Sequence, residues 1–272
     1  MKISNYTQIY IFFLLAGCGG DITPPGQDFI YSRFPSEHTL LANSSSIDHG
    51  LFDSDEDFNN AKRGMIALAP EIGPPGHDGK PIWDRSDNLF ATTAAPDTVN
   101  PILWRQARLN SYRGLFEVEE GIFQIRGFDL ANMTLIKSEN GWIILDPLTT
   151  IESTKAALDF AELYLGTIIP TAIIISHSHI DHFGGIHNVI GRSDDDDLPI
   201  ITPSGFLYEA TSEHILAGPA MARRAAYMMG LELETSALGH VDSGLGKRVI
   251  SGSTSITKPN IEISKSEEAL II

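Results

Sequence analysis

The sequence predicts an α/β fold, because a hairpin, a helix and a buried strand follow one another within residues 133–175. Asn140 and Gly141 separate the apolar runs 133–136 and 142–145, and this is a strong hairpin signal. Residues 152–165 then carry apolar side chains at helical spacing and end at Gly166, and the continuous apolar run 172–175 is typical of a strand buried on both faces. This order indicates a βαβ unit, in which ligands bind at the carboxyl ends of the strands.

The first 17 residues have the composition of a secretory signal peptide. Lys2 precedes an apolar run over residues 9–15, which is far shorter than the roughly 20 residues of a membrane-spanning helix. The tetrad Leu15-Ala16-Gly17-Cys18 resembles the lipobox of bacterial lipoproteins, in which the cysteine carries the lipid. We therefore expect a secreted, periplasmic protein that is anchored to a bacterial membrane through Cys18. The alternative is an ordinary cleaved signal in which Cys18 is incidental.

Residues 18–110 are expected to form an anchor linker and an irregular N-terminal segment. Proline and serine clusters interrupt this stretch, and its hydrophobic periodicity is weak. Two pieces favour short helices, over residues 57–69 and over residues 100–110.

Regular patterns resume from residue 111, where the domain 111–272 is expected to begin. Residues 115–126 alternate apolar and polar positions around a break at Gly121, which predicts a bent strand or a tight hairpin. Residues 221–229 favour a further helix, and residues 267–272 resemble a strand that is cut short.

The composition limits the ligand classes that are compatible with this chain. The 272 residues are 42% hydrophobic, and 19 Lys and Arg stand against 35 Asp and Glu, for a net charge of −16. Such a charge repels nucleic acid, and a small anion would need a local source of positive charge. The chain has one cysteine, which excludes a disulfide within the chain and a cysteine-based zinc site. A metal would have to be held by histidines and carboxylates.

Three imidazoles and a carboxylate crowd the loop that follows the buried strand. In extended backbone His177 and His179 point the same way and can reach one cation. Asp181 and His182 are adjacent on the turn that enters the next helix, so they can reach a second cation beside the first. Imidazole and carboxylate ligands suit zinc, and also iron or manganese.

The pattern His177-x-His179-x-Asp181-His182 resembles the metal motif of the metallo-β-lactamase superfamily. Further blocks resemble its alkyl sulfatase branch, which hydrolyses dodecyl sulfate and related esters; they cover residues 99–106, 127–134, 142–148, 212–218, 221–225 and 241–247. The resemblance implies an αββα sandwich with two zinc ions. It also implies a sulfuric ester hydrolase in which a water shared by the zincs loses a proton and attacks as hydroxide, while their charge receives the anionic ester.

The resemblance also implies roles for single residues. His177 and His179 are placed on one zinc, and Asp181 and His182 on the other. Asp146 is a candidate for orienting a ligand histidine, or else an ordinary turn residue before Pro147. Arg223 and Arg224 are candidate sulfate contacts, because guanidinium groups bind oxyanions bidentately; the alternative is a solvated helix face.

Two side chains per metal fall short of the three protein ligands that a hydrolytic zinc commonly has. In the family the further ligands, two acidic residues and a histidine, follow the block 241–247, and members continue through a dimerisation region for a homodimer and a C-terminal domain. We therefore expect an N-terminal portion with an incomplete sandwich. Glu213, His214, His240 and Asp242 are possible substitute ligands, although their spacing does not support this role.

Two alternative functions share the metal motif. One is another hydrolase of the same fold, such as a lactamase or a thioesterase, and the other is a non-catalytic metal-binding remnant.

Overall fold

The computed structural model describes residues 34–46, 54–76, 78–85 and 94–265, within a compact unit that extends from Phe34 to Ile272. The proposed signal peptide, the lipobox Cys18 and the expected strand at 267–272 lie outside the described residues. Across the described ranges, no helix is both long and apolar enough to cross a membrane.

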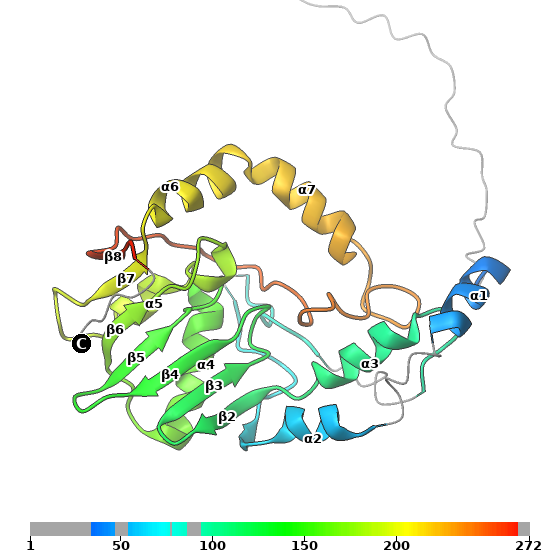
Figure 1. Cartoon of the computed structure of the whole chain (residues 1–272), viewed down its shortest axis with the longest axis horizontal. Helices are drawn as coiled ribbons and strands as arrows, with labels where there is room; N and C mark the ends of the chain where they lie inside the picture. The colour runs from blue at the N-terminus through cyan, green and yellow to red at the C-terminus, as the bar shows by residue number, and fades with distance from the viewer. Residues whose placement is uncertain (1–33, 47–53, 77, 86–93, 266–272) are drawn as a thin grey trace, which may run out of the picture. The chain divides into compact units, whose positions relative to one another are not determined.

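The described strands form one eight-stranded sheet whose spatial order follows the chain (Figure 1). Neighbours from the first to the fifth strand pair antiparallel, and those from the fifth to the eighth pair parallel. The strands are β1 (Met65–Leu68), β2 (Gly114–Glu119), β3 (Ile122–Arg126), β4 (Met133–Lys137), β5 (Trp142–Leu145), β6 (Pro170–Ile174), β7 (Ile200–Pro203) and β8 (Ile261–Ile263). This arrangement confirms the predicted α/β class and the predicted hairpin β4–β5. Of the two alternatives for residues 115–126, a bent strand or a tight hairpin, the structure shows the hairpin β2–β3.

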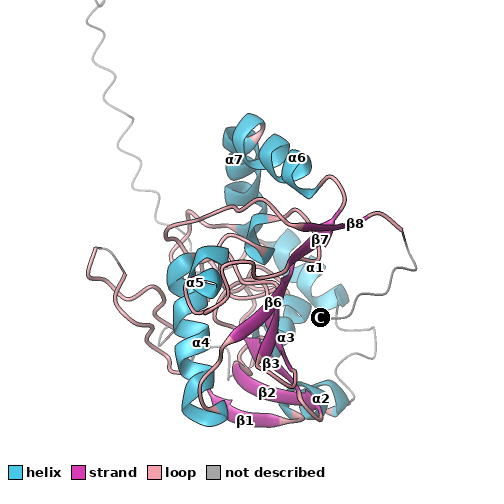
Figure 2. Ribbon diagram, turned by 90° about the vertical axis from the view of Figure 1, so that its left-hand side faces the viewer, coloured by secondary structure: helices cyan, strands magenta, loops and turns pink. Residues whose placement is uncertain are grey.

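Helices lie on both sides of this sheet, as Figure 2 shows with the sheet close to edge-on. Helices α4 and α5 lie on one side, and α2 and α3 lie on the other side, near β1 and β2. The α-helices are α1 (Glu37–Ser45), α2 (Glu56–Lys62), α3 (Pro101–Leu109), α4 (Ile151–Leu165), α5 (Ile186–Ile190), α6 (Phe206–Thr211) and α7 (Gly218–Met229). The described residues also include the 3-10 helix η3 (Ile180–His182) and the π-helix η4 (Ser212–Leu216).

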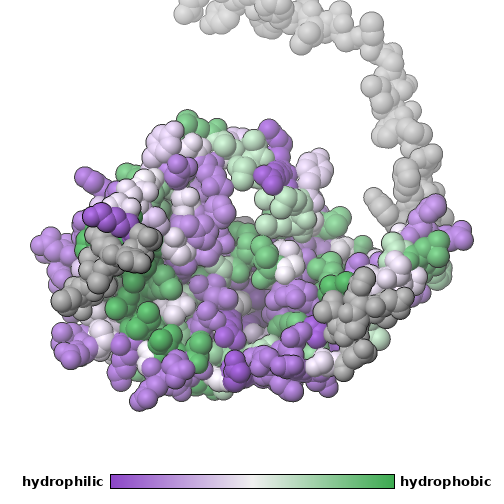
Figure 3. Space-filling view, in the orientation of Figure 1, coloured by the Kyte–Doolittle hydropathy of each residue, from purple (hydrophilic) through white to green (hydrophobic). Residues whose placement is uncertain are grey.

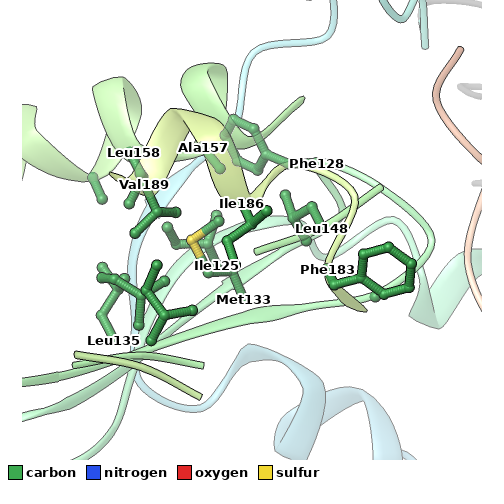
Figure 4. Packing of buried hydrophobic residues seen from close by; sticks show 14 of the residues in the cluster. Ile125, Phe128, Met133, Leu135, Leu148, Ala157, Leu158, Phe183, Ile186 and Val189 are labelled. Atoms are coloured by element: carbon green, nitrogen blue, oxygen red, sulfur yellow. The ribbon is translucent and has the colours of Figure 1, made fainter. Parts of the chain in front are cut away.

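The main core lies between the sheet and helices α4 and α5 (Figure 4). Leu135 of β4 and Leu158 of α4 are fully buried there, together with Val189 of α5. Helix α4 begins with a capping box between Thr150 and Ser153, which satisfies backbone N–H groups at its first turn. The predicted helix 152–165 is thus confirmed with its start one residue earlier.

The prediction of one helix over residues 57–69 is wrong in its second half. Helix α2 ends at Lys62, and Met65–Leu68 pairs with β2 as strand β1. Between them Gly64 has φ +73°, and a Cβ there would collide with the carbonyl oxygen of Glu117. The chain therefore turns at a position that accepts only glycine without strain, and sheet pairing outweighs the helical spacing of the apolar residues.

Residues before 111 contribute side chains to the interior. Trp83 packs edge-on against Phe128 with ring centroids 5.1 Å apart. Helix α3 confirms the helix predicted over residues 100–110. Its Trp104 forms a smaller buried cluster with Val99 and Val241. The described part of this proline-rich segment therefore adds a strand and buried apolar surface to the fold.

A buried carboxylate joins three separate segments of the chain. Asp129 is 1% exposed and accepts hydrogen bonds from the backbone N–H groups of Leu130, Thr149 and Ile250 and from the Ser153 hydroxyl, at 2.7–3.2 Å. Burial raises the pKa of Asp129, while these four hydrogen bonds act in the opposite direction. The side chain thereby connects the loop after β3 to the start of α4 and to the segment near residue 250.

The sheet face opposite α4 carries partly exposed apolar side chains. Alternation along β4, β5 and β6 buries Leu135, Ile144 and Ile173 against the helices and turns Ile136, Ile143 and Ile174 to the other side. Figure 3 shows hydrophobic residues gathered over this part of the sheet. The part of this sheet face formed by β4, β5 and β6 is therefore apolar, as is typical of a surface that packs against another layer.

Candidate metal centre

The histidine-rich motif lies at the carboxyl ends of the parallel strands β5 and β6. Asp146 directly follows β5, and Ser176 and the motif follow β6. Asp146 and Leu148 have φ values of 59° and 54°, a left-handed conformation that is uncommon for residues other than glycine and recurs at functional sites. The βαβ unit predicted from sequence therefore positions the motif in the expected place.

Asp146 holds the two sides of this loop together. Its Oδ1 accepts the backbone N–H of Ser176, and its Oδ2 accepts the Ser176 hydroxyl, both at 2.8 Å. The same Oδ2 lies 2.8 Å from Nδ1 of His182. This contact leaves the other ring nitrogen of His182 for a metal, and it is the contact that a residue orienting a ligand histidine must make.

His182 lies between two carboxylates. Its Nε2 is 3.4 Å from Oδ2 of Asp181, on the side of the ring opposite Asp146. Burial lowers the pKa of His182, but the hydrogen bonds and negative charges of Asp146 and Asp181 outweigh it and raise the pKa to about 9. The metal-free imidazole is therefore protonated at neutral pH.

His177 and His179 form the second pair. Nε2 of His177 and Nδ1 of His179 are 3.0 Å apart, and Nδ1 of His177 is 2.9 Å from the Ser176 hydroxyl. The rings of His177 and His182 are 4.1 Å apart between centroids, so the two pairs are neighbours. Burial and the adjacent histidines lower the pKa of His177.

The donor set fits metal binding in pairs. In His177 and His182, one ring nitrogen is fixed by Ser176 or Asp146 and the other faces a second candidate ligand. Neutral imidazole and carboxylate are the ligand types that zinc accepts. Across the described residues, however, no group of three or more histidine, cysteine or acidic side chains converges as a metal site. The four predicted ligands therefore meet as two pairs.

Helix η4 brings two further polar residues to the motif. Oε1 of Glu213 is 3.7 Å from Nε2 of His179, and Nε2 of His214 is 3.1 Å from the carbonyl oxygen of Ser178. The sequence spacing gave no support to either residue as a ligand, because their approach depends on where a distant helix packs. A π-helical turn is rare and frequent at functional sites, and sequence periodicity does not reveal it.

The other candidates lie away from the motif. Arg223 and Arg224 are exposed on α7, and no hydrogen bond or ion pair of the described residues joins them to the motif, so sulfate contact stays a prediction. Asp242 is buried and forms an ion pair of 3.3 Å with Lys247. His240 is buried in the wall of a separate cavity.

Comparisons with known proteins place the fold of this chain among one group of hydrolases. The family model of the metallo-beta-lactamase superfamily matches residues 126–270. A linear primary-alkylsulfatase from Pseudomonas sp. is 39% identical over 241 residues, and an (R)-specific secondary-alkylsulfatase from Pseudomonas sp. is 41% identical over 242 residues. The solved structure of a stereoselective inverting sec-alkylsulfatase from Pseudomonas sp. superposes with a TM-score of 0.80 at 39% identity.

These matches cover most of this chain and a smaller share of each relative. Each curated relative aligns with 87% of this chain and with 36% of its own length, and the solved structure aligns with 87% and 38%. The chain thus spans little more than a third of the relatives it matches, as expected for an N-terminal portion of such a protein.

Proposed function

Because this chain belongs to the metallo-beta-lactamase superfamily, we propose that it carries the metal-binding part of a zinc-dependent hydrolase of alkyl sulfate esters such as dodecyl sulfate. The alkylsulfatase relatives support the substrate class. One structural observation carries the metal assignment: Asp146 holds His182 so that its free nitrogen faces Asp181, beside the facing nitrogens of His177 and His179.

We assign each pair to one zinc ion, with His177 and His179 on the first and Asp181 and His182 on the second. Zinc, when bound, supplies positive charge for an anionic ester and lowers the pKa of a water molecule. The residues of the chain position this chemistry. Asp146 fixes the tautomer of His182, and Ser176 connects Asp146 to His177.

Zinc titration of this chain and a sulfate-release assay with dodecyl sulfate test the proposal. We expect zinc binding that His177→Ala weakens, because that variant deletes one of only two ligands in its pair, and turnover that chelation abolishes once the remaining ligands of the site are supplied. His38→Ala is the matched control, since His38 is exposed on α1, away from the motif. Hydrolysis of a β-lactam or a thioester in preference to dodecyl sulfate would contradict the assigned substrate class.

A second candidate function is metal binding without catalysis. The observation that favours it is the arrangement in pairs, which gives each ion two ligands where a catalytic zinc commonly has three. It predicts that the chain binds zinc, that His177→Ala weakens this binding, and that dodecyl sulfate is not hydrolysed. The same zinc titration and sulfate assay therefore separate the two candidates.

We also propose that the chain is secreted and anchored to a bacterial membrane through a lipid on Cys18. The proposal depends on the lipobox-like tetrad that ends at the only cysteine of the chain. We expect incorporation of a fatty-acid label and recovery in the membrane fraction, and we expect Cys18→Ser to abolish the label and release the protein. A labelled Cys18→Ser variant would refute this assignment.

A further inference from the structure

We propose that a cavity between residues 81–85 and residues 240–251 binds a tetrahedral oxyanion, of the sulfate or phosphate type, at a site separate from the metal centre. The cavity has a volume of about 270 Å³. Its walls are Pro81, Ile82, Trp83, Asp84, Arg85, Thr235, His240, Lys247, Arg248, Val249, Ile250 and Ser251, and none of these belongs to the histidine motif.

Basic side chains converge on this cavity. Arg85, His240 and Lys247 are only 3%, 5% and 5% exposed, and Arg248 joins them in the wall. Nη1 of Arg85 and Nε of Arg248 are buried donors that have no hydrogen-bond partner in the structure as described. Nε2 of His240 is also buried without a partner, and burial and the neighbouring Arg248 lower the pKa of this imidazole, which favours its neutral form. A buried donor without an acceptor costs on the order of 1–3 kcal/mol, and an anion in the cavity would remove that cost.

The nearby carboxylates also have interaction partners. Oδ1 of Asp242 accepts hydrogen bonds from the side chain of Asn110 and the backbone of Gly244, while its Oδ2 lies 3.3 Å from Nζ of Lys247 as an ion pair but is buried without a hydrogen bond in the structure as described. Asp129 accepts four hydrogen bonds of its own, and Asp84 also has an interaction partner.

The electrostatic environment agrees with an excess of positive charge. Burial and the neighbouring Arg113 lower the pKa of Arg85 to about 10, although Asp129 and Asp242 act in the other direction. Burial also lowers the pKa of Lys247, with a smaller contribution from Arg85 that opposes the attraction of Asp242. Burial is the main cause of both pKa shifts, and repulsion from neighbouring arginines adds to it.

The shape and chemistry favour an oxyanion over a simple halide. Guanidinium groups bind the oxygens of sulfate and phosphate through paired N–H donors, and Arg85 and Arg248 both offer free donors here. The cavity holds several times the roughly 30 Å³ that one water occupies in the liquid, so an oxyanion fits with bridging waters. In a chain of net charge −16, such a cluster is the local positive source that a small anion needs.

The test is calorimetric titration of the full 272-residue chain with sodium sulfate and sodium phosphate, in chelator and at constant ionic strength set with sodium chloride. We expect saturable binding of one anion per chain, and a change in fluorescence, because Trp83 lies in the wall beside Arg85. Binding is expected to persist in His177→Ala, because the metal motif is not involved. Whichever of sulfate and phosphate binds more tightly is the preferred ligand of the cavity.

Arg85→Met should weaken this binding at least tenfold, and Arg63→Met, which removes the same charge from an exposed position, should leave it unchanged. If Arg85→Met does not fold, Arg248→Met serves as the second variant and should also weaken binding. The inference is overturned if neither anion binds, if chloride competes equally well, or if the folded cavity variants bind as tightly as the parent chain.

Discussion

Asp146→Asn is expected to lower the zinc affinity of the chain by about 10- to 100-fold at pH 9. The carboxylate accepts Nδ1–H of His182, which fixes the ring and increases the electron density of the nitrogen that faces Asp181. Asparagine tolerates the left-handed backbone of Asp146, where φ is 59°, so the substitution changes the charge without adding backbone strain. Zinc titration with a competing chelator measures the effect.

The size of this effect should depend on pH. Zinc binds neutral imidazole, and in the metal-free chain the pKa of His182 is raised to about 9, so zinc competes with a proton at pH 7. Asp146→Asn removes one of the charges that raise this pKa and thereby weakens the competing proton. We therefore expect the difference in affinity between parent and variant to increase between pH 7 and pH 9.

The raised pKa of His182 also makes the stability of the metal-free chain depend on pH. The folded pKa of about 9 exceeds the unfolded value of 6.5, so the stabilising contribution of protonated His182 is complete below pH 6.5 and is lost as the pH rises through 9. NMR titration of the imidazole checks the pKa and its decrease in Asp146→Asn. Asp196→Asn, at an exposed position of the acidic run 194–197, is the matched control, and an unchanged His182 pKa in Asp146→Asn would contradict the role of Asp146.

Local patterns predicted the centre of the fold well. The Asn-Gly turn, the helix ending at Gly166 and the apolar run after it are determined by residues close in sequence, and the structure confirms β4, β5, α4 and β6. The apolar positions of residues 65–68 also had helical spacing. Their pairing with β2 is a long-range interaction, and this is why the expected helix 57–69 is divided into a helix and a strand.

The residues of the candidate site also fall into two groups: those that the order of the strands brings together, and those that meet only through the packing of distant elements. The motif residues and Asp146 follow neighbouring strands, so their proximity follows from the βαβ order. Glu213 and His214 reach the motif only because helix η4 packs over it, and Arg85 meets Lys247 across a cavity formed by distant segments. Single spacings in a sequence do not encode such contacts, because they depend on the packing of whole elements.

Substitution of Asp129 is expected to have the largest effect on stability, because its buried carboxylate accepts hydrogen bonds from three separate segments of the chain. The backbone N–H groups of Thr149 and Ile250 are its most vulnerable partners, since both residues are buried and no other acceptor of these N–H groups is found in the described structure. Removal of the carboxylate costs less at the Ser153 hydroxyl, because this hydroxyl can donate its hydrogen bond to the carbonyl oxygen of Thr150 instead. Each unsatisfied buried N–H costs on the order of 1–3 kcal/mol.

Asp129→Ala should therefore decrease the free energy of unfolding by about 3 kcal/mol, measured by urea denaturation at pH 7. Asp129→Asn is the matched variant. Its Oδ1 can still accept hydrogen bonds from the backbone N–H groups of Leu130 and Ile250. Its amide NH2 group would instead face the Thr149 N–H, which loses its acceptor, and the Ser153 hydroxyl, which can rotate and accept a hydrogen bond. The asparagine variant should thus lose less stability than the alanine variant. Because Asp129 connects the loop after β3 to the start of α4, backbone N–H exchange should accelerate first at Thr149 and Ile250. Equal losses in both variants, or a loss below about 1 kcal/mol in alanine, would mean that the carboxylate does not hold these segments together.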